Sequence, residues 1–436
     1  MGKNYLSKDV YTAALERIAV AFQSFDKVLV AFSGGKDSGV MLNLCYEYAK
    51  ENGLLHKMAM YYEDYEGGYT MTAEYIDRCF KGYEGVEKYW LCLPIKARCS
   101  ASMFQTHWIP WDRDDREIWI REYPDVPQLI TEDNCPFPFT KGTSGFETRI
   151  LFAKWFSSTH GKTAVMVGIR ADESLSRLST ITSQHRTYMH EGLRYTKIVD
   201  DCTVNFYPIY DWSTQDIWIA NGKFGWDYNR LYDLFYQAGL TIDQMRVASP
   251  FHECGQATLK LFKVIEPQTW GRMVSRVNGV NFTGIYGGTT AMGWRTITKP
   301  AGFTWEQYAR FLIETLPPDA KKRILYNIER INLTWATKGY GRNPEVIAQM
   351  EHEGIELEHT GAIARNCTKP KVYEIVKRKS GMPDDTAIPV FRKCPNWKGV
   401  CITILKNDFT CQYMGCGRTK TDMEKRMRAL EKYKNL

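Results

Sequence analysis

The sequence predicts an α/β fold, built on a doubly wound and mainly parallel sheet, with a mixed α+β extension towards the C-terminal end. Two observations lead to this fold class. Over roughly the first half of the chain, short apolar runs alternate with segments that have helical periodicity. A glycine-rich loop also separates the first apolar run from the helical segment after it, as is typical of βαβ units that bind phosphate groups.

Each expected element rests on the spacing of its apolar residues. Side chains three and four positions apart share one helix face, and this spacing predicts helices within residues 15–22, 40–48 and 146–156. Short apolar runs are typical of buried parallel strands, and they occur at residues 27–32, 58–62 and 164–169. The Pro317-Pro318 pair is expected to introduce a further helix at 319–335.

The chain is expected to divide into three parts. Residues 1–245 hold the strand and helix alternation, residues 246–366 form a mainly helical extension, and residues 367–436 form a basic, cysteine-containing module. Within the first part, residues 105–145 are rich in Trp, Pro, Asp and Arg and lack clear periodicity, which suggests an insertion or lid.

The charge of the chain is concentrated near its C-terminal end. The 436 residues include 57 Lys and Arg against 50 Asp and Glu, for a net charge of +7. Residues 368–436 hold 16 basic and 7 acidic side chains, whereas the rest of the chain holds 41 and 43. This distribution excludes a uniformly basic nucleic-acid binder and predicts a basic tail on a nearly neutral body.

The sequence shows no feature of export or membrane insertion. It contains no apolar stretch after an N-terminal basic cluster and no run of about 18 apolar residues. The 12 cysteines lack the regular spacing of a disulfide framework. We therefore expect a cytoplasmic protein without a membrane span, whose cysteines are thiols or metal ligands.

The glycine-rich loop has the composition of a phosphate cradle. Its glycines allow backbone N–H groups to approach an anion, the following helix directs its positive dipole end to the same point, and a lysine and two serines add donors. Because Val30 and Asp37 stand where a Walker A loop needs Gly and Ser or Thr, the loop is not of that type. The residues of this loop are Ser33, Gly34, Gly35, Lys36, Asp37 and Ser38.

This loop resembles the pyrophosphate (PP) loop of the N-type ATP pyrophosphatases, a superfamily of Rossmann-like, adenine nucleotide alpha hydrolase type proteins that includes the phosphoadenosine phosphosulfate (PAPS) reductases. Residues 168–174, GIRADES, are similar to the GxRxxES element of that family. Residues 207–218, YPIYDWSTQDIW, are similar to its P-x-x-D-W-S-x-x-D-x-W element. The three motifs occur in the family's order over roughly residues 25–220.

The resemblance implies a nucleotide site with ATP or an adenylyl sulfate as ligand and Mg²⁺ on its phosphates. Lys36, Asp37 and Arg170 are the candidate catalytic residues, and Arg170 follows a strand where it can pair with a phosphate or sulfate. An ion pair of Arg170 with Glu173 that binds no ligand is the alternative. The candidate nucleotide-binding residues are the six of the loop with Glu63, Asp64, Gly168, Arg170, Glu173 and Asp211.

Two of these assignments have structural alternatives of their own. Glu63 and Asp64 follow the second strand, where a carboxylate can bind ribose hydroxyls or a divalent ion, but a solvated loop fits the pattern as well. Asp211 and Ser213 can instead cap the helix that begins near Thr214.

The preferred function is an enzyme that adenylates an acceptor at the α-phosphate and releases pyrophosphate. A thiol-dependent PAPS or adenylyl-sulfate reductase is the rival within the superfamily, although Cys254, in the segment ECGQ, lacks the His of the reductases' ECGxH segment. A nucleotide-sensing regulator that associates with DNA is the alternative from another class. The long extension resembles the immunoglobulin-binding-regulator-A type branch, which implies a ParB-like partner protein and a role in DNA modification.

The tail offers a second candidate site. Cys394, Cys401, Cys411 and Cys416 fall within 23 residues and can either bind Zn²⁺ or remain thiols, since no C-x2-C pair is present. Basic residues such as Lys377, Arg378 and Lys398 alternate there with aromatic ones, which suggests nucleic-acid contact through residues 368–436 or a solvated basic face. Residues 421–430 have the pattern of a capped amphipathic helix.

Overall fold

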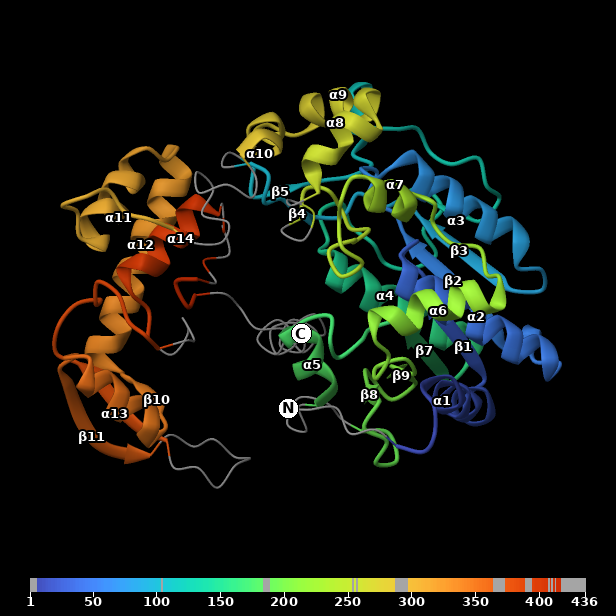
Figure 1. The fold of residues 1–436 in the computed structure, drawn as a ribbon, viewed down its shortest axis with the longest axis horizontal. Helices are drawn as coiled ribbons and strands as arrows, with labels where there is room; N and C mark the ends of the chain where they lie inside the picture. Colours follow the sequence, from blue (N-terminus) through green and yellow to red (C-terminus); the bar gives the residue numbers. More distant parts are fainter. Residues whose placement is uncertain are drawn as a thin grey trace. The chain divides into compact units, whose positions relative to one another are not determined.

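The computed structural model describes residues 6–102, 105–182, 189–252, 255, 258–286, 297–363, 373–388, 394–406, 408, 411 and 413–416 (Figure 1). The chain folds into two compact units. The N-terminal unit comprises Met1–Arg98 and His107–Arg276, and the C-terminal unit comprises Cys99–Thr106 and Val277–Leu436. No helix among the described residues combines the length and the apolar character that crossing a membrane requires.

A seven-stranded sheet forms the centre of the N-terminal unit, with the strand order β6-β3-β2-β1-β7-β9-β8. Every neighbouring pair runs parallel except β8 and β9, which confirms the predicted fold class. The strands are β1 (Lys27–Ala31), β2 (Met58–Glu63), β3 (Glu87–Leu91), β6 (Leu129–Ile130), β7 (Thr163–Val167), β8 (Thr196–Ile198) and β9 (Thr203–Phe206). A separate antiparallel pair joins β4 (Ala97–Arg98) to β5 (His107–Trp108).

Helices cover both faces of this sheet because alternate strand residues are apolar on each side. Val28 and Val30 pack into a core with residues of the first three helices, whereas Leu29 faces Phe152 and Phe156 of α4. The helices of this unit are α1 (Val10–Ser24), α2 (Lys36–Glu51), α3 (Thr70–Gly82), α4 (Gly145–His160), α5 (Leu175–Thr182), α6 (Thr214–Phe224), α7 (Leu231–Gln237), α8 (Phe262–Ile265) and α9 (Pro267–Arg276).

The Trp-rich segment that we expected to be an insertion or lid is part of the core. Trp111 and Trp119 are 0% and 2% exposed and pack in the same core as Val28. The carboxylate of Glu66 accepts the backbone N–H groups of Trp111 at 2.7 Å and Ile120 at 2.9 Å. A buried carboxylate that is fully hydrogen-bonded fixes the segments around it, so this segment is held in place rather than free to open.

Glu66 also binds Arg276, which is the last residue of the N-terminal unit. Arg276 donates to Glu66 from Nε at 3.0 Å, and the two side chains are almost completely buried. The unit therefore continues to Arg276, 31 residues beyond the boundary expected at residue 245.

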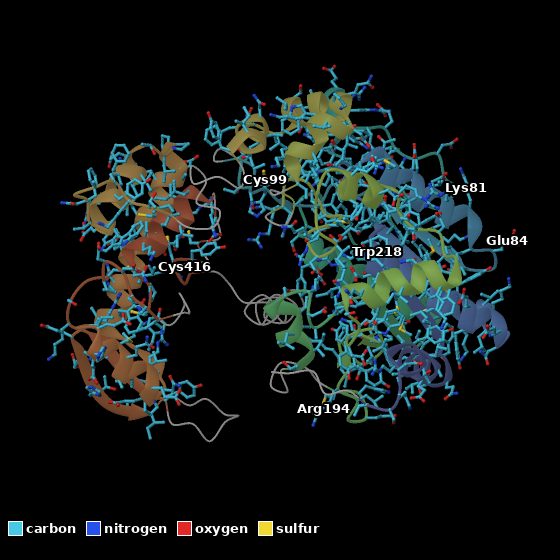
Figure 2. All side chains as sticks on the ribbon, viewed as in Figure 1. Lys81, Glu84, Cys99, Arg194, Trp218 and Cys416 are labelled. Atoms are coloured by element: carbon cyan, nitrogen blue, oxygen red, sulfur yellow. The ribbon has the colours of Figure 1, made fainter. Side chains whose placement is uncertain are left out.

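The C-terminal unit combines helices with a three-stranded antiparallel sheet of order β10-β12-β11. Its elements are α10 (Val280–Tyr286), α11 (Trp305–Glu314), α12 (Pro318–Thr337), β10 (Tyr340–Arg342), α13 (Pro344–His352), β11 (Leu357–Ile363), β12 (Glu374–Arg378) and α14 (Trp397–Leu405). One hydrophobic core runs from Trp305 to Met414 and unites residues from both sides of the expected boundary at 366. Side chains fill the interior of each unit (Figure 2).

The four cysteines of the tail lie in or against this core. The Cys401 thiol lies 3.6 Å from the carbonyl of Trp305, and Cys411 lies 3.3 Å from the amide of Asn327 and accepts the backbone N–H of Cys416 at its carbonyl. Burial raises the pKa of all four thiols, to about 11 for Cys394 and about 12 for Cys401 and Cys411. No group of three or more His, Cys, Asp or Glu among the described residues is placed to hold a metal ion.

The basic residues of the tail are partly engaged within the unit. Lys377 pairs with Glu358 at 3.0 Å and Lys398 with Asp385 at 2.7 Å, while Arg378 is buried. Arg378 therefore does not belong to an exposed basic face. The expected C-terminal helix at 421–430 lies outside the described residues.

We predict a pH-dependent contribution to the stability of the C-terminal unit from His359. Its ring nitrogens contact Glu374 at 3.1 Å and Glu351 at 2.8 Å, and hydrogen bonds to these carboxylates raise the pKa of His359 above 6.5. A raised folded-state pKa means that the pairing stabilises the unit fully below pH 6.5 and is lost as the pH rises through the raised pKa.

Thermal unfolding between pH 5.5 and 9 should show this trend. The stability difference between the native chain and His359→Gln is expected to be largest at the acid end and to shrink as the pH rises. His352→Gln, at an exposed position on α13, serves as the control and should keep the native pH dependence. A constant difference across this range would contradict the assignment.

Candidate functional site

Two of the sequence motifs meet at the topological switch point of the sheet. β1 lies between β2 and β7 in the sheet. Helix α2, which follows β1, and helix α4, which precedes β7, pack on opposite faces of the sheet. Ligands of open α/β sheets bind outside the carboxyl ends of the strands at such a point. The loop Ser33–Ser38 follows β1, and Gly168 follows β7.

The two loops touch at Gly168. A Cβ atom at this position would lie 2.9 Å from the carbonyl oxygen of Asp37 and 3.2 Å from the Cα of Ser38. Only glycine permits this approach of two backbones. The second motif thus begins with glycine because its backbone packs directly against the glycine-rich loop.

Within the loop, hydrogen bonds and glycine geometry fix the backbone. Gly34 has a φ of +70°, and a Cβ there would lie 2.9 Å from Ile76. The hydroxyl of Ser38 accepts the N–H of Ser33 at 3.1 Å and donates to the carbonyl of Gly35 at 3.0 Å. Because the N-cap of α2 is Gly35, which has no side chain to cap the helix, the N–H groups of the first turn other than that of Lys36, which bonds to Tyr232, can face an anion.

Lys36 is held from the segment around α7. Its backbone N–H donates to the phenol oxygen of Tyr232 at 3.0 Å, and its Nζ donates to the carbonyl of Met245 at 3.2 Å. The same Nζ lies 3.4 Å from the carboxylate of Asp37. Burial raises the pKa of Tyr232, so the phenol stays protonated near neutral pH.

Arg170 is a buried positioning group in this structure. It is 3% exposed, and it donates from Nε to Asp37 at 2.5 Å and from Nη1 to Asp172 at 2.6 Å. The sequence suggested Glu173 as the partner of Arg170, but Glu173 instead lies 3.6 Å from Arg177. The motif therefore ties Asp37 of the loop to the segment after β7.

The two carboxylates after β2 have different surroundings. Asp64 is 1% exposed and accepts from Trp90 at 2.7 Å, from Arg121 and from the N–H of Glu66 at 2.9 Å. These hydrogen bonds fix the Asp64 carboxylate in the fold, at the edge of the pocket described below. Glu63 pairs with Arg149 through Oε2, but its Oε1 is buried without a hydrogen-bond partner.

The third motif anchors the fold rather than the loop. Both carboxylate oxygens of Asp211 accept from Arg17 of α1, at 2.8 and 2.7 Å. Ser213 and Asp216 form a capping box at the start of α6. The capping alternative therefore holds for Ser213 but not for Asp211, which pairs with Arg17 instead. Asp211 is not among the residues that line the pocket described next.

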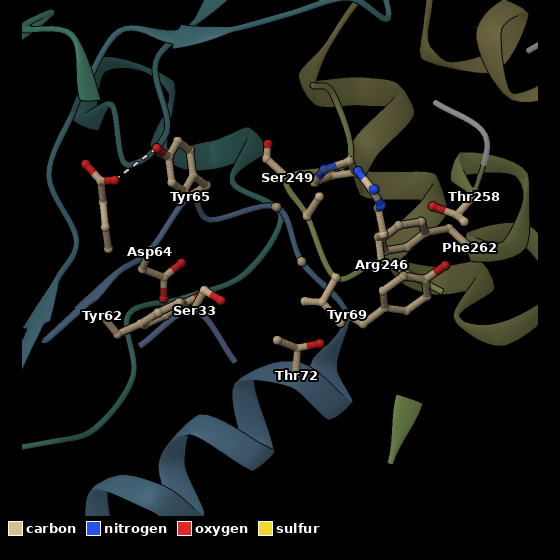
Figure 3. Close-up of a pocket in the computed structure, with 16 residues that line it drawn as sticks. Ser33, Tyr62, Asp64, Tyr65, Tyr69, Thr72, Arg246, Ser249, Thr258 and Phe262 are labelled. Carbon is tan, nitrogen blue, oxygen red and sulfur yellow. Dashed lines mark hydrogen bonds between the residues drawn. The ribbon is translucent and has the colours of Figure 1, made fainter. Parts of the chain in front are cut away.

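A pocket of about 140 Å³ opens beside Ser33 and the end of β2 (Figure 3). Its wall comes mainly from the end of β2 with the loop that follows it, residues 62–69, and from the irregular segment 246–250, with Thr72 of α3 and Phe262 of α8. The sequence pointed to Glu63 and Asp64 but gave no signal for the segment 246–250. Tyr69 and Phe262 lie face to face with ring centroids 3.6 Å apart. Besides these two, the lining includes Tyr62, Glu63, Asp64, Tyr65, Thr72, Arg246, Ser249 and Thr258.

Among the residues that the structure describes, three polar atoms of this pocket are buried without a hydrogen-bond partner. They are Oε1 of Glu63, the hydroxyl of Tyr69 and Oγ of Ser249, all buried. Buried polar groups are nearly always hydrogen-bonded, and leaving one unpaired costs roughly 1–3 kcal/mol. Their concentration in one pocket indicates a polar ligand.

Comparison with known proteins places the second and third motifs, but not the loop Ser33–Ser38, within a matched family domain. Residues 149–238 match the phosphoadenosine phosphosulfate reductase domain, and residues 239–425 match a domain of unknown function, DUF3440. The Escherichia coli (strain K12) protein YbdN is 32% identical over 422 residues, which cover 95% of this chain and 92% of YbdN. The chain therefore belongs to the YbdN family and carries a PAPS reductase-like domain.

Solved structures with a similar arrangement are more distant. The PAPS reductase of Candida auris, in a phosphate complex, is 13% identical, with coverage of 57% of this chain and 98% of that chain and a TM-score of 0.32. The U34-tRNA thiolase NcsA of Methanococcus maripaludis, with its [4Fe-4S] cluster, is 13% identical, with coverage of 66% and 84% and a TM-score of 0.29. At these values the likeness carries no functional assignment.

We predict that Gly168→Ala disturbs the loop. The added Cβ would overlap the backbone of Asp37, so the substitution should lower the free energy of unfolding by about 1–3 kcal/mol. It should also weaken phosphate binding, because the loop must shift.

Gly222→Ala is the matched control in urea denaturation. Nothing lies within 4 Å of a Cβ at this exposed position of α6, so the change should stabilise the helix by up to about 1 kcal/mol. Equal effects of the two substitutions would show that the contact at Gly168 has no energetic importance.

Proposed function

We propose that this protein is a nucleotide-dependent enzyme that binds ATP or an adenylyl sulfate at the loop Ser33–Ser38 and acts at the α-phosphate. The observation that carries the proposal is the position of this loop. It lies at the switch point of the sheet, with its backbone in close contact with Gly168. Beside it is a pocket in which the Glu63, Tyr69 and Ser249 side chains each have a buried oxygen without a hydrogen-bond partner.

The phosphates fit the loop end of the site. The first turn of α2 supplies backbone N–H groups and the positive end of the helix dipole, and Ser33 and Ser38 supply hydroxyls 2.9 Å apart. Lys36 adds a positive charge that its contacts with Met245 and Asp37 hold near the loop. Neutral donors and one cation in a partly enclosed site suit a pyrophosphate group.

The nucleoside fits the neighbouring pocket. Ribose hydroxyls both donate and accept hydrogen bonds, so they can satisfy the carboxylate oxygen of Glu63 and the hydroxyls of Tyr69 and Ser249. The aromatic pair of Tyr69 and Phe262 gives the pocket an apolar wall for a planar base. Ser33 lines both regions, which joins the two halves of the ligand.

In the reaction that we propose, a nucleophilic atom of the acceptor attacks the α-phosphorus of ATP. The bond between the acceptor and phosphorus forms as the bond to the bridging oxygen breaks, and the electron pair leaves with pyrophosphate. The α2 N-terminus and Lys36 stabilise the negative charge that develops on this leaving group. Arg170 keeps Asp37, and with it Lys36, in place.

The described residues do not build a dedicated site for Mg²⁺. Asp64 is hydrogen-bonded within the fold, Asp37 is paired with Arg170 and Lys36, and no cluster of three metal-ligating side chains occurs in the part of the chain that the structure describes. A magnesium ion would have to depend on the phosphates and water.

Product analysis distinguishes this proposal from its rivals. Incubation with ATP, Mg²⁺ and candidate acceptors should release pyrophosphate and form adenylated product. Sulfite formation from PAPS with a thiol donor would instead establish a reductase. This assay is included because residues 149–238 match the reductase domain. Tight nucleotide binding without turnover would establish a sensor.

Lys36→Ala should reduce turnover by about two orders of magnitude or more, because it removes the cation that faces the leaving group. Calorimetric titration with pyrophosphate should show weaker binding by the same variant. Lys50→Ala, at an exposed position of the same helix, should leave both values unchanged. Unchanged pyrophosphate affinity in Lys36→Ala would refute the phosphate assignment.

Ser249→Ala is expected to weaken nucleotide binding while making the free protein slightly more stable. The hydroxyl is buried without a partner, so its removal should stabilise the chain by roughly 1 kcal/mol in the absence of ligand. Thr203→Val is the matched control, because its Oγ1 is likewise buried and unpaired but lies on β9, outside the pocket.

The control should gain stability and keep the native affinity for nucleotide. Thermal unfolding and nucleotide titration of both variants measure the two quantities separately. If Ser249→Ala binds nucleotide as tightly as the native chain, the hydroxyl does not contact the ligand.

A further inference from the structure

Arg246 is a cation of the pocket beside Ser33 that pairs with no carboxylate of the described residues. Its side chain is partly buried and lines the pocket together with Ser33 and Ser249 (Figure 3). Nη2 donates to the backbone carbonyl of Glu173 at 2.9 Å, which is the one hydrogen bond that Arg246 makes to the part of the chain that the structure describes. The N–H groups of Nε and Nη1 are therefore available to a ligand.

The other charged side chains around the loop and the pocket are balanced by ion pairs. In the pocket wall, the carboxylates of Glu63 and Asp64 each pair with an arginine. At the loop, two cations face two carboxylates, and Asp37 contacts both cations. Arg246 therefore adds a positive charge that no carboxylate in these surroundings offsets, and this charge favours an anionic ligand.

The backbone on both sides of Arg246 is held near the start of α2. The carbonyl of Met245 accepts Nζ of Lys36 at 3.2 Å, and the backbone of Val247 hydrogen-bonds to the phenol of Tyr232. The same phenol accepts the backbone N–H of Lys36 at 3.0 Å. Because Arg246 also bonds to the segment after β7, it lies where the pocket meets the glycine-rich loop.

Arg246 offers the contacts that the sequence assigned to Arg170. Arg170 was expected to pair with a phosphate or sulfate, but its guanidinium is 3% exposed and bonds to Asp37 and Asp172. An arginine that is engaged by two carboxylates has less capacity left for a ligand. Arg246 belongs to the same unit, lines the pocket and has N–H groups without partners among the described residues.

We propose that Arg246 binds the α-phosphate of the nucleotide. This inference rests on the proposed function, in which the terminal phosphates occupy the loop and the nucleoside occupies the pocket. Ser33 lines both regions, so the α-phosphate lies between them, at the end of the pocket that Arg246 lines. A guanidinium can donate to two phosphate oxygens and offset their charge. The nucleotide site then includes a residue of the segment 239–425, outside the match to the PAPS reductase domain.

Arg272 of α9 provides a matched control, because it makes the same type of contact outside the pocket. Its Nη1 donates to the backbone carbonyl of Trp119 at 3.3 Å, and it is not among the residues that line the pocket. Arg272 also belongs to the N-terminal unit. Arg272→Gln therefore removes the same charge and a similar hydrogen bond at a site that does not touch the nucleotide.

The test is a calorimetric titration of the full chain with ATP, AMP, pyrophosphate and adenosine. AMP carries the α-phosphate alone, pyrophosphate represents the group at the loop, and adenosine carries no phosphate. In Arg246→Gln, the affinities for AMP and ATP should fall by at least about tenfold, whereas those for pyrophosphate and adenosine should not change. Arg272→Gln should leave all four affinities unchanged.

The four probes separate this inference from the proposed function. If the native chain binds ATP and AMP, but Arg246→Gln binds AMP as tightly, the inference is wrong and the proposed function stands. An equal loss of adenosine affinity in Arg246→Gln would also overturn the inference, because a purely structural role affects both probes. Absence of ATP and AMP binding by the native chain would overturn both.

A measurement on the unsubstituted Arg246 covers the case in which Arg246→Gln does not fold. The chain carrying Lys36→Ala lacks the cation at the loop but keeps Arg246. It should still bind AMP at least about tenfold more tightly than adenosine, because the contact to the α-phosphate remains. Equal affinities for AMP and adenosine in this chain would overturn the inference.

Discussion

The buried ion pair between Arg170 and Asp37 is the interaction on which the candidate site depends. It joins the loop after β1 to the segment after β7, and the close approach of Gly168 to the backbone of Asp37 brings the two loops together. An arginine at 3% exposure needs such partners, because an unpaired charge in this position would be strongly destabilising. The resulting geometry keeps Lys36 beside Asp37 and leaves the first turn of α2 directed towards an anion. The rest of the N-terminal unit serves to maintain this arrangement.

Unpaired polar atoms distinguish the pocket from the interior around it. The oxygens of Glu63, Tyr69 and Ser249 favour a ligand with several hydroxyl groups. By contrast, Asp64 and Glu66 are equally buried but accept the hydrogen bonds that fix the Trp-rich segment. A single unpaired atom does not indicate a site, since Oγ1 of Thr203 is also buried without a partner and lies outside the pocket. The observation that favours a ligand is that three unpaired oxygens lie in one pocket.

The sequence predicted the sheet well because its strands are short apolar runs buried on both faces, and these are visible without tertiary information. Residues 27–32, 58–62 and 164–169 correspond to β1, β2 and β7. The sequence said less about where the N-terminal unit ends, since residues 246–276 lack a pattern that assigns them to either unit. The sequence suggested Glu173 as the partner of Arg170, because a sequence shows a cation beside a loop but not the groups that pair with it. Asp37, 133 residues earlier in the chain, becomes that partner only when β1 and β7 lie side by side.

The sequence by itself determined the fold class, the position of the glycine-rich loop between a strand and a helix and the order of the three motifs. These follow from local composition and periodicity, which act over a few residues. Tertiary structure decided which carboxylates are engaged and which are available, since Asp64, Asp211 and Glu63 differ only in the side chains that surround them. It also placed Arg378 in the interior, although its neighbours in sequence are exposed or partly exposed cations. The physical reason is the same in each case: desolvation and pairing depend on residues distant in the chain, and no local pattern records them.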